Sequence, residues 1–197
     1  MKLANLFYLF VYFLLWIPVH LLYPMVIRGR SNIPDGACII CANHSNYIDP
    51  LLIIYAFGPR RFLHTMSKKE NIEKPVVGWI YRMCGAFPVE RGGIDMGAVR
   101  TTMTLLKKGD KVVIFPEGTR TTWDDPEAGK AGAVRFASKL SVPIVPIFIT
   151  RNKKILGLVR IRIGEAYEVC CRTRAEYEEK TRDLMNTIFA LGKVDES

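Results

Sequence analysis

The 197-residue sequence lacks the features of disulfide-rich, disordered and repetitive proteins. Its five cysteines are an odd number, which argues against a complete disulfide framework and favours a reducing compartment. No Gly/Ser linker and no internal repeat is evident, and the length fits one domain with a substantial core. Acidic residues are scarce, 19 against 28 Lys and Arg, which gives a net charge of +9. That excess predicts an anionic partner: nucleic acid, a lipid surface or a phosphorylated substrate.

Charged residues are absent from residues 3–27, which carry seven of the 21 aromatic residues. A helix needs about 20 apolar residues to span a bilayer, so the run is nominally long enough. Pro18 interrupts it, however, and Tyr and Trp favour the headgroup level. Two alternatives follow, one kinked spanning helix or two shorter segments embedded in a single leaflet, and we favour the second. Arg28 and Arg30 then predict a cytoplasmic position for the rest of the chain.

A cleaved signal peptide and a buried core helix are the other interpretations of this run. A signal peptide requires a small-residue cleavage site after the apolar stretch, and residues 18–22 offer none. Buried core helices are typical of shorter apolar runs of about 10–14 residues. We therefore predict a membrane-anchoring hydrophobic segment over residues 1–27 and a folded domain over residues 28–197.

Short apolar runs alternate with helix-period segments in the folded domain. We predict buried strands at 37–42, 111–115, 142–149 and 159–163. Asp95 is suited to cap a helix that ends near residue 108, and a Thr173-x-x-Glu176 capping box predicts a helix to about residue 191. Strands that alternate with helices predict an α/β fold. We expect a single domain with a central mixed sheet flanked by helices, preceded by the N-terminal helical segment.

The most informative polar stretch follows the first predicted strand and contains His44 and Asp49. In open α/β sheets ligands bind beyond the carboxyl ends of strands, which is where His44 lies. The two residues are five positions apart, so the intervening chain must turn if the carboxylate is to reach the imidazole. An Asp in contact with the ring fixes its tautomer and stabilises the imidazolium, as a general base requires. In the alternative interpretation Asp49 and Pro50 only begin the next helix, and His44 is a core residue.

A second polar stretch, Phe-Pro-Glu-Gly-Thr-Arg at residues 115–120, also follows a predicted strand. Gly118 permits close backbone approach, Thr119 offers a hydroxyl, and Arg120 can bind a phosphate through two parallel hydrogen bonds. The alternative is a surface turn with an ion pair between Glu117 and Arg120, which would contribute little stability.

Four segments, taken together in chain order, resemble the four sequence blocks of the glycerolipid acyltransferases. They are His44-x-x-x-x-Asp49, residues 85–91, residues 115–120 and residues 142–147. The nearest type is the lysophosphatidic acid acyltransferase family. The second block ends in Arg91, and the fourth contains two prolines that predict an irregular start to its strand. The resemblance extends over about residues 28–165 and implies that residues 28–197 form an acyltransferase catalytic domain.

The resemblance implies a thioester acyl donor, acyl-CoA or acyl carrier protein, and a lysophospholipid acceptor, with no cofactor. His44 would be the general base on the acceptor hydroxyl, and Asp49 would orient it. The expected substrate-binding residues are Glu117, Gly118, Thr119, Arg120, Arg91, Lys68 and Lys130. A thioester is already activated, so one base plus donors to the developing oxyanion suffice, without an enzyme nucleophile.

Two other signals carry less weight. The pair Cys38-x-x-Cys41 has metal-like spacing, but no second ligand pair follows it and both thiols lie in an apolar strand, so we predict no metal site. A basic cluster lies near the C-terminal strands, and we expect it to face solvent. Its members are Arg151, Lys153, Lys154, Arg160 and Arg162.

The sequence therefore predicts a membrane-bound enzyme at the cytoplasmic face of the cell membrane. It would move a fatty acyl group to the sn-2 hydroxyl of lysophosphatidic acid and give phosphatidic acid. The expected partners are the bilayer, the lysophospholipid and the acyl donor, and no nucleic acid, because the scattered basic residues form no nucleic-acid motif. Two alternatives stay open: another acceptor (glycerol 3-phosphate or a different lysophospholipid), or a non-catalytic membrane-surface binding protein.

Overall fold

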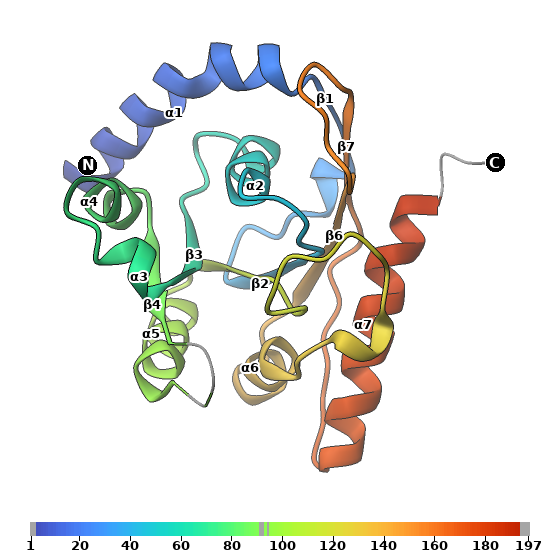
Figure 1. Cartoon of the computed structure of the whole chain (residues 1–197). Helices are drawn as coiled ribbons and strands as arrows, with labels where there is room; N and C mark the ends of the chain where they lie inside the picture. Colours follow the sequence, from blue (N-terminus) through green and yellow to red (C-terminus); the bar gives the residue numbers. More distant parts are fainter. Residues whose placement is uncertain (1–2, 91–92, 94, 194–197) are drawn as a thin grey trace.

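A mixed β-sheet runs through the middle of the protein, with helices on both faces (Figure 1). The computed structural model describes residues 3–90, 93 and 95–193, and within these ranges seven strands form one sheet in the order β1-β7-β6-β2-β5-β3-β4. This mixed sheet flanked by helices confirms the predicted α/β fold. The strands are β1 (Met25–Arg28), β2 (Cys38–Ala42), β3 (Leu63–Lys68), β4 (Ala86–Val89), β5 (Lys111–Ile114), β6 (Ile144–Ile149) and β7 (Val159–Ile163).

The connections between these strands are mostly helical. In the described ranges the helices are α1 (Leu3–Leu22), α2 (Asp49–Phe57), α3 (Lys69–Ile72), α4 (Pro75–Met83), α5 (Met96–Lys107), α6 (Gly132–Leu140) and α7 (Arg174–Lys193), with 3-10 turns η1 (Arg30–Asn32) and η2 (Pro126–Ala128).

Two apolar clusters, one on each face of the sheet, form the core. The central strand β2 is buried along its whole length and contributes to both, because successive side chains of a strand point to opposite faces. Cys38 and Ile40 pack with α1 and α2, whereas Ile39 and Cys41 pack with α5, α6 and α7. In Figure 1, α1 and α2 accordingly lie above the sheet and α5 and α6 below it.

Parallel pairing brings the carboxyl ends of the central strands to one edge of the sheet. Strand β2 pairs in parallel with β5 on one side and with β6 on the other, so that Cys41 lies opposite both Ile114 and Pro146. The loops that leave β2, β5 and β6 are therefore neighbours in space. Strand β7 then returns antiparallel to β6, and β1 pairs with β7 at the outer edge.

The elements predicted near the centre of the sheet are confirmed, whereas β1, β3 and β4 are not in the prediction. Asp95 caps α5, and its side chain accepts the N–H groups of Gly97 and Ala98 at 2.8 and 3.0 Å. The strand expected at 142–149 begins only at Ile144, because Pro143 cannot donate a ladder hydrogen bond.

The uncharged N-terminal run forms one continuous helix and then an edge strand. Pro18 lies inside α1 and does not divide it, so the expectation of two shorter segments is wrong. Residues 25–27 belong to β1 and pair with β7, instead of extending the hydrophobic segment. Tyr8 and Tyr12 of α1 are buried, and Tyr55 of α2 donates its hydroxyl hydrogen to the Tyr12 carbonyl at 3.0 Å. None of the described helices is long and apolar enough to cross a membrane.

Candidate active site

The loop that leaves β2 places His44 beside Asp49, the first residue of α2. The His44 Nδ1 and Asp49 Oδ2 atoms are 3.0 Å apart. The same oxygen accepts the backbone N–H groups of Ser45 and Asn46, each at 2.8 Å, so the loop curls around the carboxylate. The turn that the spacing required is present, and Asp49 points back to the imidazole. With Nδ1 on the carboxylate, Nε2 is the ring nitrogen left to accept a substrate proton.

His44 lies in the wall of a cavity of about 1210 Å³. Its side chain is 12% exposed, and its ring stacks on Phe115 with the centroids 4.1 Å apart. Apolar side chains of α1, α2 and α4 line the cavity, among them Tyr12, Leu51 and Ile80. Charged side chains line it too: the cations Lys68, Lys74, Arg120 and Lys130, and the carboxylates Glu70, Glu90 and Asp95. This combination of apolar and cationic groups suits an amphipathic, anionic ligand.

Asp49 is buried and is held in its ionised form by two partners. Burial raises the pKa of Asp49, but the hydrogen bond with His44 and the ammonium of Lys153 outweigh burial and hold that pKa below its ordinary value. The Lys153 Nζ and Asp49 Oδ1 atoms are 2.7 Å apart, and neither side chain is accessible to solvent. Burial lowers the pKa of Lys153, while the facing carboxylate opposes that shift. A carboxylate held in this way can orient an imidazole and stabilise its protonated form.

Glu117 joins the loop after β5 to the loop after β2. Its Oε2 atom accepts the backbone N–H of His44 at 2.6 Å, and the Thr121 N–H donates to the His44 carbonyl at 2.8 Å. Its Oε1 atom lies 2.5 Å from Arg151 Nη2 and accepts the Thr121 hydroxyl at 3.1 Å. Glu117 therefore pairs with Arg151 and not with Arg120. The Glu117 side chain is only 1% exposed, so its carboxylate is bound by groups of the protein and not by solvent.

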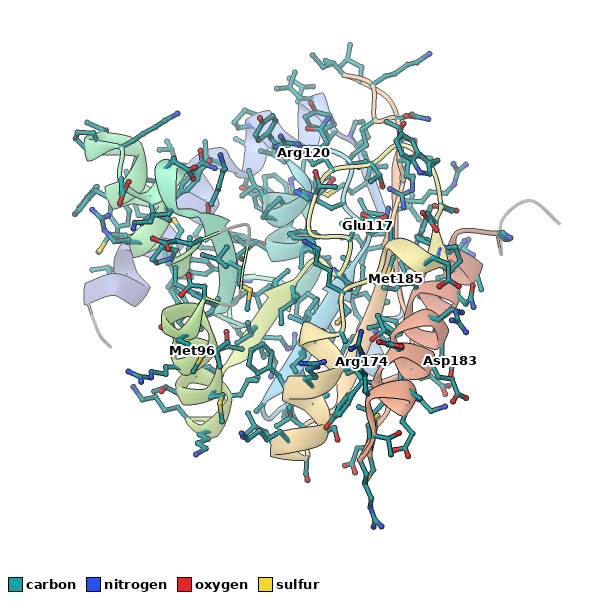
Figure 2. The ribbon with its side chains drawn as sticks, turned by 60° about the horizontal axis from the view of Figure 1, so that its bottom comes forward. Met96, Glu117, Arg120, Arg174, Asp183 and Met185 are labelled. Carbon is teal, nitrogen blue, oxygen red and sulfur yellow. The ribbon has the colours of Figure 1, made fainter. Side chains whose placement is uncertain are left out.

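The next residues of this loop face the cavity and the solvent. Glu117 and Arg120 lie close together on the same loop (Figure 2), but Arg120 and Thr119 are exposed. The Arg120 guanidinium carbon lies 3.5 Å from the centre of the Tyr47 ring. Gly118 has φ of +68°, and a Cβ there would come within 2.9 Å of Lys130 Nζ. The structure thus brings a guanidinium and an ammonium to one wall of the cavity, where together they can bind a phosphate.

The other two expected substrate-binding residues are Lys68 and Arg91. Lys68 ends β3, lines the cavity and forms an ion pair with Glu70 at 2.9 Å, with 45% of its side chain exposed. Arg91 lies outside the described residues. The residue before it, Glu90, lines the cavity.

Two cations after β6 belong to the site, although the sequence predicted that they face solvent. The Arg151 side chain is 9% exposed and also pairs through Nε with Asp124 at 2.7 Å, and Lys153 is buried against Asp49. The prediction of a solvent-facing cluster is wrong for both, and for Arg162, which is buried as well. One sequence signal could have indicated where these two cations lie. They follow β6, the parallel neighbour of β2, so they are at the same edge of the sheet as His44.

The cysteines of β2 do not share a site. Cys38 and Cys41 point to opposite faces of the sheet, and burial raises the pKa of the Cys38 thiol to about 11. A raised pKa disfavours the thiolate, which is the form that binds metals and attacks carbonyls. In the part of the chain that the structure describes, no group of three or more His, Cys, Asp or Glu side chains could hold a metal ion.

The fold and the site define an α/β protein with a His–Asp pair at the carboxyl edge of its sheet and cations beside it. The sequence model of the acyltransferase family matches residues 25–150. The chain belongs to that acyltransferase family.

Relatives of known name agree with this assignment. The chain is 33% identical over 145 residues to the 1-acyl-sn-glycerol-3-phosphate acyltransferase of Bacillus subtilis, covering 71% of each chain. It is 34% identical to the Streptococcus pneumoniae protein of the same name over 67% of this chain, but it spans only 49% of that relative's length. The crystal structure of the 1-acyl-sn-glycerophosphate (LPA) acyltransferase PlsC from Thermotoga maritima has the same fold, with a TM-score of 0.66 at 22% identity, covering 97% of this chain and 78% of that one.

Proposed function

We propose that this protein transfers a fatty acyl group from an acyl thioester to the sn-2 hydroxyl of lysophosphatidic acid, giving phosphatidic acid. The observation that carries the proposal is the His44–Asp49 pair, which opens onto a cavity lined by apolar and cationic side chains. The names of the relatives support the same reaction. No cofactor is needed, because the thioester is an activated acyl donor.

His44 is the general base of the proposed reaction. Its Nε2 atom accepts the proton of the acceptor hydroxyl while the hydroxyl oxygen attacks the thioester carbonyl. The imidazolium that forms is stabilised by Asp49 through Nδ1, and its proton then passes to the departing thiolate. The new ester bond replaces the thioester bond, so the reaction releases one free thiol for each acyl group transferred.

The acceptor phosphate is bound by the cations at the cavity wall. Arg120 supplies a planar guanidinium with parallel N–H donors, and Lys130 lies close to Gly118 of the same loop. Lys68 approaches from the end of β3. We assign Thr119 and Arg91 to the same acceptor region. Glu117 acts differently, through its bond to the His44 backbone, because its own carboxylate is engaged by Arg151.

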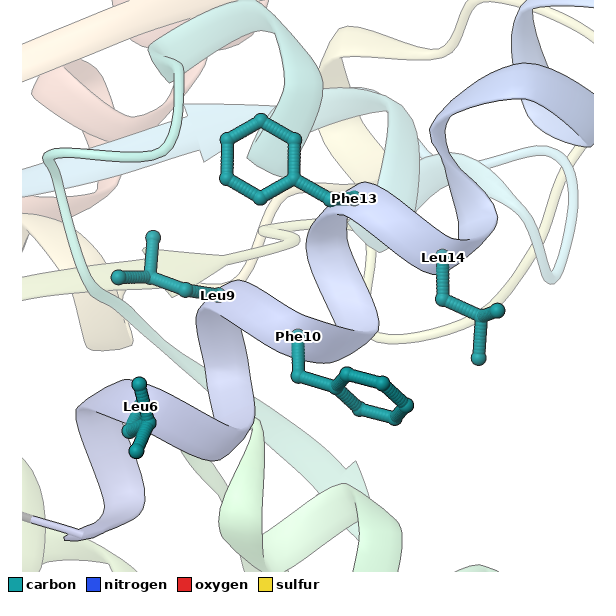
Figure 3. Close-up of a pocket in the computed structure, with 5 residues that line it drawn as sticks. All are labelled: Leu6, Leu9, Phe10, Phe13 and Leu14. Atoms are coloured by element: carbon teal, nitrogen blue, oxygen red, sulfur yellow. The ribbon is translucent and has the colours of Figure 1, made fainter.

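We further propose that α1 lies on the cytoplasmic membrane surface and immerses its outer face in one leaflet. Figure 3 shows the side chains of Leu6, Leu9, Phe10, Phe13 and Leu14, which surround a shallow pocket of about 440 Å³ on α1. Phe10, Phe13 and Ile17 are each more than 60% exposed, so this helix presents apolar surface. The opposite face of α1 lines the cavity that holds His44, which gives a lipid acceptor a short path from leaflet to site.

Thiol release by the purified protein in detergent tests the reaction. The assay supplies either acyl-CoA or acyl carrier protein as donor, with or without lysophosphatidic acid, and His44→Gln is compared with His64→Gln. His64 is the matched control, because it also faces a carboxylate, Asp110, at 3.7 Å, but lies in β3. We expect acceptor-dependent release that His44→Gln abolishes and His64→Gln retains. If thiol release occurs with glycerol 3-phosphate or another lysophospholipid but not with lysophosphatidic acid, that compound replaces the proposed acceptor. If no combination of donor and acceptor gives release, a binding protein is favoured.

Vesicle flotation tests the membrane contact. The double variant Phe10→Ser/Ile17→Ser removes two exposed side chains of α1 and should lower the fraction bound to anionic vesicles at least tenfold, since apolar burial drives such binding. Met96→Ser is the control, because Met96 is 56% exposed on α5, on the other face of the sheet. Equal binding of both variants and the wild type would show that α1 does not contact the bilayer.

A further inference from the structure

A lysine ammonium is buried directly against the carboxylate of the His–Asp pair. Lys153, in the loop between β6 and β7, places its Nζ atom 2.7 Å from Asp49 Oδ1, with no side-chain surface left to solvent on either residue. The same ammonium donates to Ser45 Oγ at 2.9 Å and to the Thr150 carbonyl at 2.5 Å. A buried lysine loses hydration and side-chain freedom, so three ordered oxygen partners are needed to hold it.

We propose that Lys153 is a positioning residue of the acyl-transfer site, which keeps Asp49 ionised and aimed at His44 and opposes protonation of the His44 ring. The inference rests on the proposed function, because it assigns Lys153 a part in that reaction. It concerns a residue outside the range that the family model matches, 25–150.

The contacts of Asp49 show why the ammonium is required. Oδ2 receives His44 Nδ1 and the N–H groups of Ser45 and Asn46, while Oδ1 faces Lys153. Without the ammonium, Oδ1 would be a buried negative atom with no countercharge. The His44–Asp49 pair would then carry a net negative charge, and it would reduce this charge by taking up a proton, most directly on His44. His44 is the group that must be unprotonated to act as a base.

The other charges around His44 do not replace Lys153. The Glu117 carboxylate contacts the His44 backbone but is matched by Arg151, so that pair adds no net charge. The other cations line the cavity that would hold the substrate, where the phosphate of the proposed acceptor would neutralise them. The charged side chains of the His44 site and of the cavity beside it are Asp49, Lys68, Glu70, Lys74, Glu90, Asp95, Glu117, Arg120, Asp124, Lys130, Arg151 and Lys153.

The pH dependence of kcat/KM for Lys153→Met tests the proposal, with Lys154→Met as the matched control. Lys154 is the next residue in the same loop and is exposed. We expect the acidic limb of the Lys153→Met profile to move to higher pH by about one unit, which is about tenfold less activity at a pH on the limb. Activity should recover towards higher pH, KM for the acceptor should change little, and Lys153→Arg should retain a profile close to that of the wild type.

An acidic limb that stays in place or moves to lower pH would overturn the proposal, because a purely structural lysine lowers activity equally at every pH. Should Lys153→Met fail to fold, the melting temperatures of Asp49→Asn, Lys153→Met and the double variant decide instead. We expect the double variant to melt above Lys153→Met, since removing both charges removes the unpaired carboxylate. Simple additivity of the two effects would refute the pairing. A wild-type protein without acyl transfer would refute the proposed function, and the same stability cycle would still test the ion pair.

Discussion

Glu117 offers a sharp test of how the active-site loops are held together. The Glu117→Gln substitution keeps the shape of the side chain but removes one of its two acceptor oxygens. Those oxygens receive the His44 backbone N–H at 2.6 Å and face the Arg151 guanidinium at 2.5 Å. The single oxygen of the amide can take the place of only one carboxylate oxygen, facing either the His44 N–H or the Arg151 guanidinium. Its NH₂ group must then face the other of these two buried donors.

The size of the effect follows from burial. A buried donor without an acceptor costs about 1–3 kcal/mol, and more when it is charged, so we expect about 3 kcal/mol lower stability. For a chain of this length each kcal/mol corresponds to about 2–4 °C, which predicts a melting temperature about 6–12 °C lower. A displaced His44 backbone should also lower kcat, by about 10- to 100-fold, because catalytic geometry tolerates little misplacement.

Calorimetry and steady-state kinetics on the same samples provide the measurement. Glu127→Gln is the matched control: Glu127 pairs with Arg182 at 2.5 Å, but its side chain is 69% exposed, so the same change should shift the melting temperature by less than about 3 °C. The acceptor KM of Glu117→Gln should stay within about twofold of the wild-type value, because the Glu117 carboxylate is engaged by the His44 backbone and by Arg151. An increased acceptor KM with unchanged kcat and melting temperature would refute this reasoning and place Glu117 in the acceptor site.

Three further predictions concern neighbouring residues. The pKa of Asp49 is lower in the folded state than in the unfolded state, so the Asp49 carboxylate stabilises the fold above about pH 4, and this contribution is lost as the pH falls further. In urea unfolding between about pH 2 and 5, the free energy of unfolding should therefore depend less steeply on pH in Asp49→Asn than in the wild type. Arg120→Gln should raise the acceptor KM at least tenfold, and Tyr47→Leu about two- to fivefold, since the ring only holds the guanidinium; equal KM values in both variants and the wild type would remove Arg120 from phosphate binding. Asn43→Ala should lower the melting temperature by about 5–15 °C, because the Asn43 amide exchanges two 2.8 Å hydrogen bonds with the Ile149 backbone; a shift below about 2 °C would contradict this.

The predictable part of the fold is the part where local pattern and burial agree. Strands β2 and β5 are short apolar runs in the parallel part of the sheet, where they are buried on both faces, so composition alone indicates them. Strand β4 contains Pro88 and lies at an edge, and β3 mixes polar with apolar residues, so neither shows a clear strand pattern. Residues 25–27 continue an uncharged run, and only their pairing with β7 makes them a strand.

The hydrophobic N-terminus is another segment whose structure the sequence pattern predicts only in part. Twenty-five uncharged residues indicate apolar surroundings without saying which ones. In the structure the helix has two apolar faces: Tyr8 and Tyr12 are buried against the domain, whereas Phe10 and Ile17 are exposed. A sequence count adds both faces together, so it overstates the length of chain available for a bilayer. Tertiary packing, which the sequence does not display, separates them.

The ion pairs of the site extend this argument from hydrophobic to charged residues. Both buried carboxylates, Asp49 at the start of α2 and Glu117 after β5, receive their cations from one loop, through Lys153 and Arg151. Each pair joins segments that are 34 or more residues apart in sequence, so no local pattern could reveal it. Two cations two residues apart in a short loop are typical of solvated surface, and only the order β6-β2-β5 in the sheet turns that loop towards both carboxylates. Since one loop neutralises both carboxylates, a shift of that loop would disturb the base and the backbone that carries it at the same time.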